Sequence, residues 1–191
     1  MQGMKAMLGG DELIKLIKNK HVFIDTCILI NYSKTEYGQE EYSKFFTWLK
    51  GLDAVFVISD ACYFEFCRAS RNREEFESRK KFITGLVDAQ LPVTNKIMTI
   101  ATAIGTLYAQ ERPNYSKSVS LQDCINASFL IGKKDILLIS NDLQDYPVSL
   151  FDCHYLYPIE VRTQGKTEIH AVGFFELNVE KLKNEIKKFW L

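Results

Sequence analysis

The chain has 191 residues, of which 47% are hydrophobic and 25% charged, a composition typical of a folded globular domain and not of a disordered or membrane-embedded chain. No apolar run approaches the roughly 18 residues that a membrane-spanning helix needs, and residues 1–10 lack the apolar core of a secretory signal, so we expect a cytoplasmic protein without membrane contact. The 24 basic side chains balance the 24 acidic ones, so a polyanion would have to be held by a local patch, and residues 68–81 are the richest one.

The first half of the chain alternates helical and strand patterns. Residues 11–18 have the apolar spacing of an amphipathic helix, and residues 21–25 form a short apolar strand that is followed at once by a helical pattern. A second amphipathic pattern covers residues 39–52. Residues 54–58 are apolar almost throughout, which is typical of a strand buried on both faces.

The second half continues the alternation. Ser59 is a predicted N-cap for a helix that ends near residue 70. The remaining predicted elements are helices at 74–86, 96–110 and 121–131, a loop at 112–119, a strand at 135–140, a polar turn at 141–147 and a short strand at 148–151.

The pattern changes near the carboxyl terminus. Residues 157–176 are typical of a β-hairpin with its turn at 164–166. Asn178 then precedes an amphipathic helix at 179–190 and is its predicted cap.

Apolar strands that alternate with helices indicate a parallel sheet covered on both sides. We therefore predict a three-layer α/β/α sandwich with a central, mostly parallel sheet. Residues 1–153 would form the main domain, and residues 154–191 an extension, the hairpin and helix, packed on it.

The five cysteines form no recognisable metal-binding or disulfide pattern. Their number is odd, their neighbours are apolar and none belongs to a CxxC spacing, so a structural zinc site is rejected. We expect them to be small buried hydrophobic side chains, at positions 27, 62, 67, 124 and 153.

Four acidic residues are expected at one edge of the sheet. Asp25 ends the first strand, and Glu65 lies in the helix after the second. Asp123 opens a later helix, and Asp142 follows the strand at 135–140. The crevice beyond the carboxyl ends of parallel strands is the usual ligand site, and carboxylates gathered there raise one another's pKa values. Hard oxygen donors of this kind suit magnesium or manganese.

Two of these acids have a structural explanation as helix caps. Asp25 can cap the helix that begins at Thr26. Ser120 and Asp123 have the spacing of a capping box. Either role would satisfy the carboxylate without a metal.

The other two acids also have structural alternatives. Asn141-Asp142 is a common turn dipeptide. Glu65 can pair with Arg68 three residues on, in a helical contact worth only about 0.2 to 0.5 kcal/mol. Each acid taken alone is therefore weak support for a metal site.

Taken together and in order, four segments resemble the PIN-domain nuclease family. They are VFIDTCILI, ISDACYFEFCRA, SLQDCINASFLI and LLISNDLQDY. The family pattern is a strand ending in Asp-Thr or Asp-Ser, a helical Glu, an Asp that opens a helix rich in small residues, and a polar residue pair ending in Asp after a strand. The resemblance covers roughly residues 21–151.

The resemblance implies a set of site residues. The implied metal ligands, which would hold one or two Mg²⁺ or Mn²⁺ ions and carry the catalysis, are Asp25, Glu65, Asp123 and Asp142. The implied supporting residues are Thr26 and Asn141, with Asp145 as an additional acid that could replace Asp142 as a ligand. Arg68, the first residue of the basic segment 68–81, is a further candidate for substrate binding.

The resemblance also implies a function, a metal-dependent endoribonuclease that hydrolyses RNA phosphodiester bonds. Short prokaryotic chains of this type commonly act as the toxin of a toxin-antitoxin pair and are inhibited by a small antitoxin protein. Two alternatives stay open: a housekeeping RNA-processing nuclease, and a catalytically inactive PIN-like module that binds RNA or protein. A homodimer is compatible with each of them.

Overall fold

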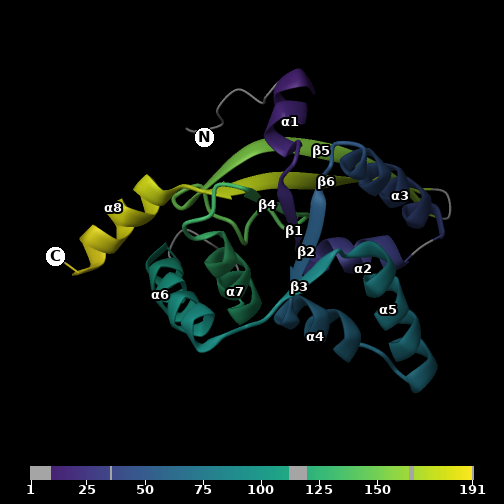
Figure 1. The fold of residues 1–191 in the computed structure, drawn as a ribbon, viewed down its shortest axis with the longest axis horizontal. Coiled ribbons are helices and arrows are strands. Elements are labelled where there is room, and N and C mark those ends of the chain that lie inside the picture. Colours follow the sequence, from purple (N-terminus) through teal and green to yellow (C-terminus); the bar gives the residue numbers. More distant parts are fainter. Residues whose placement is uncertain (1–9, 35, 112–119, 164–165, 191) are drawn as a thin grey trace.

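The computed structural model describes residues 10–34, 36–111, 120–163 and 166–190 (Figure 1). The helices are α1 (Gly10–Ile17), α2 (Thr26–Lys34), α3 (Glu36–Lys50), α4 (Asp60–Arg68), α5 (Arg73–Leu86), α6 (Asn95–Glu111), α7 (Leu121–Leu130) and α8 (Val179–Trp190). The strands are β1 (His21–Ile24), β2 (Val55–Ser59), β3 (Ala89–Leu91), β4 (Ile136–Ser140), β5 (Phe151–Thr163) and β6 (Lys166–Leu177).

The strands form one sheet in the order β3-β2-β1-β4-β6-β5. The pairs among β3, β2, β1 and β4 are parallel, whereas β6 pairs antiparallel with both β4 and β5. The parallel strands therefore end together at one edge of the sheet, which we call the carboxyl edge.

One face of the sheet packs against α7 and the turn that follows β4. Phe23, Leu138 and Phe175 are register partners on β1, β4 and β6, so their side chains leave the sheet on the same face. The ring of Phe23 stacks on Phe129 of α7 with centroids 5.5 Å apart, and the ring of Phe175 lies 5.2 Å from that of Tyr146.

Helix α3 covers the opposite face. Phe56 of β2 and Phe174 of β6 are one position out of step with the first set and so point the other way. The ring centroids of Phe46 and Phe56 are 5.1 Å apart, and those of Phe45 and Phe174 are 6.1 Å apart. The predicted three-layer α/β/α sandwich with a mostly parallel sheet is confirmed.

Local capping signals account for several helix starts. Ser59 Oγ accepts a hydrogen bond from the Cys62 amide at 3.1 Å and caps α4. Asn178 Oδ1 accepts from the Lys181 amide at 3.0 Å at the start of α8. Both predicted caps are confirmed, because a cap depends only on neighbours in the chain.

Two strand predictions differ from the structure. β3 was not predicted, because this three-residue edge strand is mostly exposed and has no apolar run. The predicted strand at 148–151 is wrong: the amides of Leu150 and Phe151 both donate to the Pro147 carbonyl in a turn, and β5 begins only at Phe151. The predicted loop at 112–119 and turn residues 164–165 lie outside the described residues.

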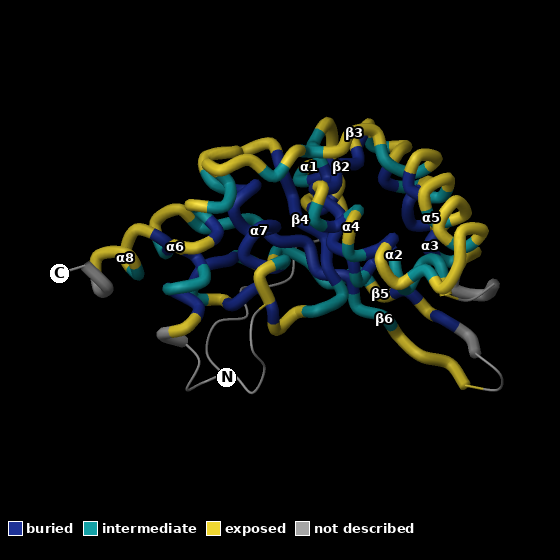
Figure 2. Tube along the Cα trace, turned by 90° about the horizontal axis from the view of Figure 1, so that it is seen from below, coloured by how far each residue is buried: buried dark blue, intermediate teal, exposed yellow. Residues whose placement is uncertain are grey.

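The carboxyl-terminal hairpin is an integral part of the sheet. β6 pairs with β4 through residues 173–175, and β5 runs across position 153–154, where the two predicted regions meet. Figure 2 shows the buried middle of the molecule in dark blue and the far end of the hairpin as exposed, in agreement with the exposed residues 166–169 and buried residues 172–175 of β6.

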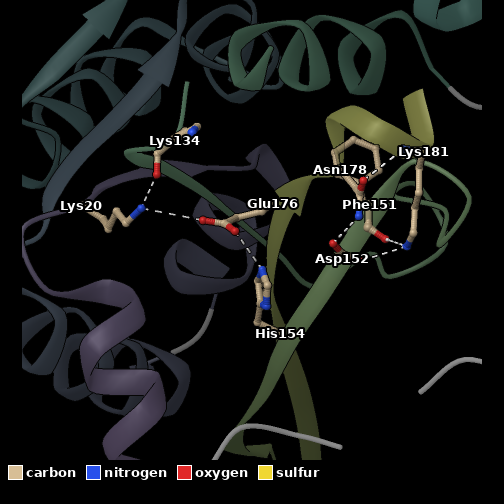
Figure 3. A network of polar contacts seen from close by, with 8 residues as sticks. All are labelled: Lys20, Lys134, Phe151, Asp152, His154, Glu176, Asn178 and Lys181. Carbon is tan, nitrogen blue, oxygen red and sulfur yellow. Dashed lines mark hydrogen bonds and ion pairs between the residues drawn. The ribbon is translucent and has the colours of Figure 1, made fainter. Parts of the chain in front are cut away.

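A polar cluster ties β6 to the amino-terminal edge of the sheet (Figure 3). Glu176 Oε2 lies 3.0 Å from His154 Nε2, and Glu176 Oε1 lies 3.8 Å from Lys20 Nζ. Lys20 Nζ also donates to the carbonyl of Lys134, just before β4. One carboxylate therefore links the hairpin to the segments that precede β1 and β4.

A second cluster in Figure 3 joins α8 to the start of β5. Lys181 Nζ donates to Asp152 Oδ1 at 2.8 Å, and Asn178 Nδ2 donates to Asp152 Oδ2 at 2.7 Å. Lys181 also donates to the carbonyls of Val148 and Phe151. None of the described helices combines the length and apolar character needed to cross a membrane.

Replacing Glu176 by Gln tests the first cluster. The hydrogen bond from His154 holds the pKa of Glu176 below its usual 4.5, so its stabilisation is fully present above pH 4.5 and is lost as pH falls through the folded-state pKa. Urea unfolding should show E176Q less stable than the wild type by about 1 kcal/mol or less at neutral pH, and a smaller difference below pH 4.5. A stability difference between E176Q and the wild type that does not change with pH would contradict this prediction. E77Q, at an exposed position on α5, is the control.

Candidate functional site

Asp25 lies at the carboxyl edge, directly after β1. Its amide donates to the Ile139 carbonyl at 3.1 Å, which continues the β1 to β4 ladder by one position. Asp25 and Ser140 therefore stand side by side on the face covered by α7. Only 4% of Asp25 is exposed.

Four side chains donate hydrogen bonds to the Asp25 carboxylate. Ser140 Oγ donates to Oδ2 at 2.7 Å, and Tyr146 Oη and Cys27 Sγ reach the same oxygen at 3.2 and 3.4 Å. Asn126 Nδ2 of α7 donates to Oδ1 at 3.2 Å. Burial raises the pKa of Asp25, and the bonds from Ser140, Cys27 and Tyr146 oppose that rise.

Asp123 is both a helix cap and a member of an acidic group. Its Oδ2 accepts from the Ser120 amide at 2.9 Å and from Ser120 Oγ at 2.7 Å, which confirms the predicted capping box. Burial raises the pKa of Asp123 from 3.8 to about 6; the Ser120 bonds oppose this, and the negative charges of Asp25 and Glu65 add to it. The structure therefore brings Asp25 and Glu65 within electrostatic reach of Asp123.

Glu65 reaches this group because α4 packs on α7. Cys62 Sγ donates to Asn126 Oδ1 at 3.3 Å and accepts from Gln122 Nε2 at 3.0 Å. Glu65 lies almost one turn further along α4 and is half-buried. Within the described residues no ion pair joins Glu65 to Arg68, which is exposed and lines a pocket between α4 and α5.

Asn141 and Asp142 hold the turn after β4. The Asn141 side chain accepts from Tyr42 Oη at 2.9 Å and from Asn31 Nδ2 at 3.1 Å, and donates to the Ala171 carbonyl at 3.0 Å. Asp142 Oδ1 accepts from the Gln144 amide at 3.2 Å, the contact expected of a turn aspartate. Asn141 thus joins α2, α3 and β6.

Thr26 and Asp145 are both buried. Thr26 Oγ1 makes no well-formed hydrogen bond to any residue that the structure describes. The Cys62 thiol nevertheless lies near enough for Thr26 to oppose the rise in the pKa of Cys62. The main-chain carbonyl of Asp145 accepts from Tyr108 Oη of α6 at 3.1 Å. The roles predicted for both residues beside a phosphate or metal stay predictions.

Two cysteines belong to the polar network around Asp25. Cys27 Sγ accepts from the Asn141 amide at 3.2 Å, and burial with the neighbouring Asp25 charge raises its pKa. Burial likewise raises the pKa of Cys62 to about 11. The prediction of five buried cysteines is wrong for Cys27, which is half-buried, and for Cys153, which is exposed.

Across the parts of the chain that the structure describes, no three His, Cys, Asp or Glu side chains are close enough to surround a metal ion. The donor chemistry nevertheless fits a hard divalent cation, because two buried carboxylates with raised pKa values and a third carboxylate interact across the carboxyl edge. Three-carboxylate coordination would require a side-chain rearrangement. If an ion binds, Asp25, Asp123 and Glu65 are the residues that would hold it.

The sequence prediction missed the partners of Asp25. Ser140, Asn126 and Tyr146 lie 101 to 121 residues away from Asp25 in the chain. The available signals were weak: Ser140 ends an apolar strand, and Asn126 is one of three polar residues, with Asp123 and Ser128, in the fully buried part of α7.

No protein-family model and no curated protein matches the chain.

The raised pKa of Asp123 predicts how stability depends on pH. Since the folded carboxyl binds its proton more tightly than the unfolded one, the free energy of unfolding should fall as pH rises from 3.8 through about 6. Asp123→Asn should remove this decline, which we expect to be on the order of 1 to 3 kcal/mol, while its amide oxygen keeps an acceptor for Ser120. Urea unfolding over a pH series measures the free energy of unfolding of both proteins at each pH.

Asp53→Asn is the matched control for this series, because Asp53 is exposed and lies on the loop before β2. It has a positive φ of 58°, which Asn also tolerates. Parallel pH profiles for the wild type and D123N would contradict the assigned electrostatic coupling.

Proposed function

We propose that this protein is a Mg²⁺- or Mn²⁺-dependent endoribonuclease of the PIN type. The observation that carries the proposal is that the buried Asp25 and Asp123 lie at the carboxyl edge of a parallel sheet, where the charges of Asp25 and Glu65 act on Asp123. Buried, mutually repelling carboxylates are costly to a fold, and a divalent cation relieves that cost.

The chain's own residues have distinct roles in this proposal. Asp25 is held in a fixed orientation by Ser140 and Asn126. Asp123 uses Oδ2 for its helix cap and makes no hydrogen bond to another described residue through Oδ1, so Oδ1 can face an ion or a proton. A bound ion would supply a water of lowered pKa as the nucleophile and charge stabilisation for the leaving oxygen.

The cellular setting belongs to the same proposal. The five cysteines are free thiols, which is compatible with the reducing cytoplasm. The PIN resemblance favours a toxin of a toxin-antitoxin pair, with a small antitoxin as partner, and a housekeeping RNA-processing nuclease is the alternative. A homodimer is compatible with both.

A non-cleaving module that binds RNA or protein is the second candidate. Its support is that the Asp25 carboxylate already accepts four side-chain hydrogen bonds, so its charge is largely compensated without a cation. In that case the acidic group would have a structural role and no catalytic one.

Asp25→Asn separates the two candidates. The amide keeps the size of the side chain and removes the charge, so metal-dependent cleavage of single-stranded RNA should be lost while the fold is retained. Cleavage of a labelled RNA is measured with Mn²⁺, with Mg²⁺ and with chelator, and circular dichroism checks folding. Asp53→Asn should cleave at the wild-type rate.

Undiminished cleavage by D25N would overturn the metal-site assignment. Absence of cleavage by the wild type with either ion would favour the non-cleaving module. Thermal unfolding gives an independent readout: Mn²⁺ should raise the Tm of the wild type and not that of D25N, because only the wild type relieves carboxylate repulsion on binding the ion.

A further inference from the structure

A cavity of about 580 Å³ lies between α4 and α5, outside the acidic group. It combines aromatic rings with guanidinium groups, and Cys67, Ser70 and Asn72 complete its wall. The aromatic and basic lining residues are Tyr63, Phe64, Phe76, Arg68, Arg71 and Arg73.

We propose that this cavity, which we call the α4–α5 pocket, binds one unstacked nucleotide of a single-stranded RNA. The base would stack on Phe64, and Arg68 and Arg73 would contact the flanking phosphates. The proposal rests on the proposed function, since it supplies the substrate contacts of the same nuclease. The volume is within the range of small-ligand pockets, and it accommodates a single nucleotide.

The charges of the pocket favour an anion. Arg79, the nearest other arginine, is engaged: it donates to Glu75 Oε1 at 2.8 Å and to the Phe66 carbonyl. By contrast, the Arg68 and Arg73 side chains form no ion pair with any other residue that the structure describes. Of the two acids in the first turn of α5, Glu75 is compensated by Arg79 and by the Arg71 amide, and Glu74 is exposed to solvent. The positive charges of Arg68 and Arg73 are therefore available to phosphate.

The aromatic residues favour an unpaired base. Phe64 is 67% exposed and Phe76 is 36% exposed, although both line the pocket. Arg68 follows Phe64 by one helical turn, so a ring and a guanidinium lie on the same side of α4. Aromatic rings beside a basic groove are the usual means of holding single strands without reading their sequence.

The position of the pocket connects it to the acidic group. Glu65 is the neighbour of Phe64 on α4, and α4 begins directly after Ser59, its cap and the last residue of β2. A strand stacked on Phe64 therefore passes beside the helix that brings Glu65 toward Asp123. A duplex cannot use this arrangement, because its bases are already stacked within the helix.

Binding is measured by fluorescence anisotropy with a short labelled single-stranded oligouridine, in chelator so that no cleavage occurs. Phe64→Ala and Arg68→Glu should each weaken binding by about tenfold or more. R68E should also reduce the slope of log Kobs against log salt by about 0.7, the loss of one phosphate contact. A duplex of oligouridine with oligoadenosine should compete poorly. Both residues are exposed, so the variants should keep the wild-type Tm.

The matched controls are Lys133→Glu, a charge reversal beside the amino-terminal end of β4, and Val148→Ala, a truncation of a side chain that is 63% exposed. Both should bind RNA like the wild type. Unchanged binding by F64A and R68E, or no RNA binding by the wild type, would overturn the pocket. If F64A and R68E sediment differently from the wild type but bind RNA like it, the pocket is a protein interface and the RNA proposal is wrong.

The test is separable from that of the nuclease. If the protein binds RNA through the pocket but cleaves no RNA, the pocket proposal stands and the nuclease proposal is wrong. If the protein cleaves RNA with a metal ion, and F64A and R68E have wild-type RNA binding and KM, the nuclease proposal stands and the pocket proposal is wrong.

Discussion

The burial of one carboxylate organises the carboxyl edge of this protein. Asp25 is almost fully enclosed, and leaving its charge without partners would cost several kcal/mol. Its donors come from α2, α7, the end of β4 and the following turn, so these elements must assemble together to satisfy it. The same donors also fix the turn, because Cys27 Sγ accepts from the Asn141 amide and Ser140 Oγ from the Asp142 amide.

Asp123 illustrates how a structural role and a chemical role can share one side chain. The capping box engages Oδ2 and orients the carboxylate, and it does not cancel the effect of burial and of the charges of Asp25 and Glu65. Capping and metal binding were alternatives when only the sequence was considered. In the folded protein they are compatible, because a carboxylate has two oxygens with several acceptor sites.

The hairpin and α4 flank the acidic group from two sides. Asn141 connects the turn after β4 to Ala171 of β6, while Cys62 connects α4 to Asn126 of α7. The PIN resemblance implied that Asn141 supports a metal or phosphate, and this role stays a prediction. In the structure the Asn141 amide joins the helices α2 and α3 to the hairpin.

The sequence by itself determined the features that depend on near neighbours: the alternation of apolar strands with helices, the caps at Ser59, Ser120 and Asn178, and the placement of Asp25 at a strand end. It did not determine that β6 would pair with β4, or that Ser140, Asn126 and Tyr146 would surround Asp25. Those contacts join residues far apart in the chain, and strand register and helix packing bring them together only in the folded state. The same holds for the raised pKa of Asp123, because burial and the approach of two other carboxylates exist only once α4, α7 and β1 have packed.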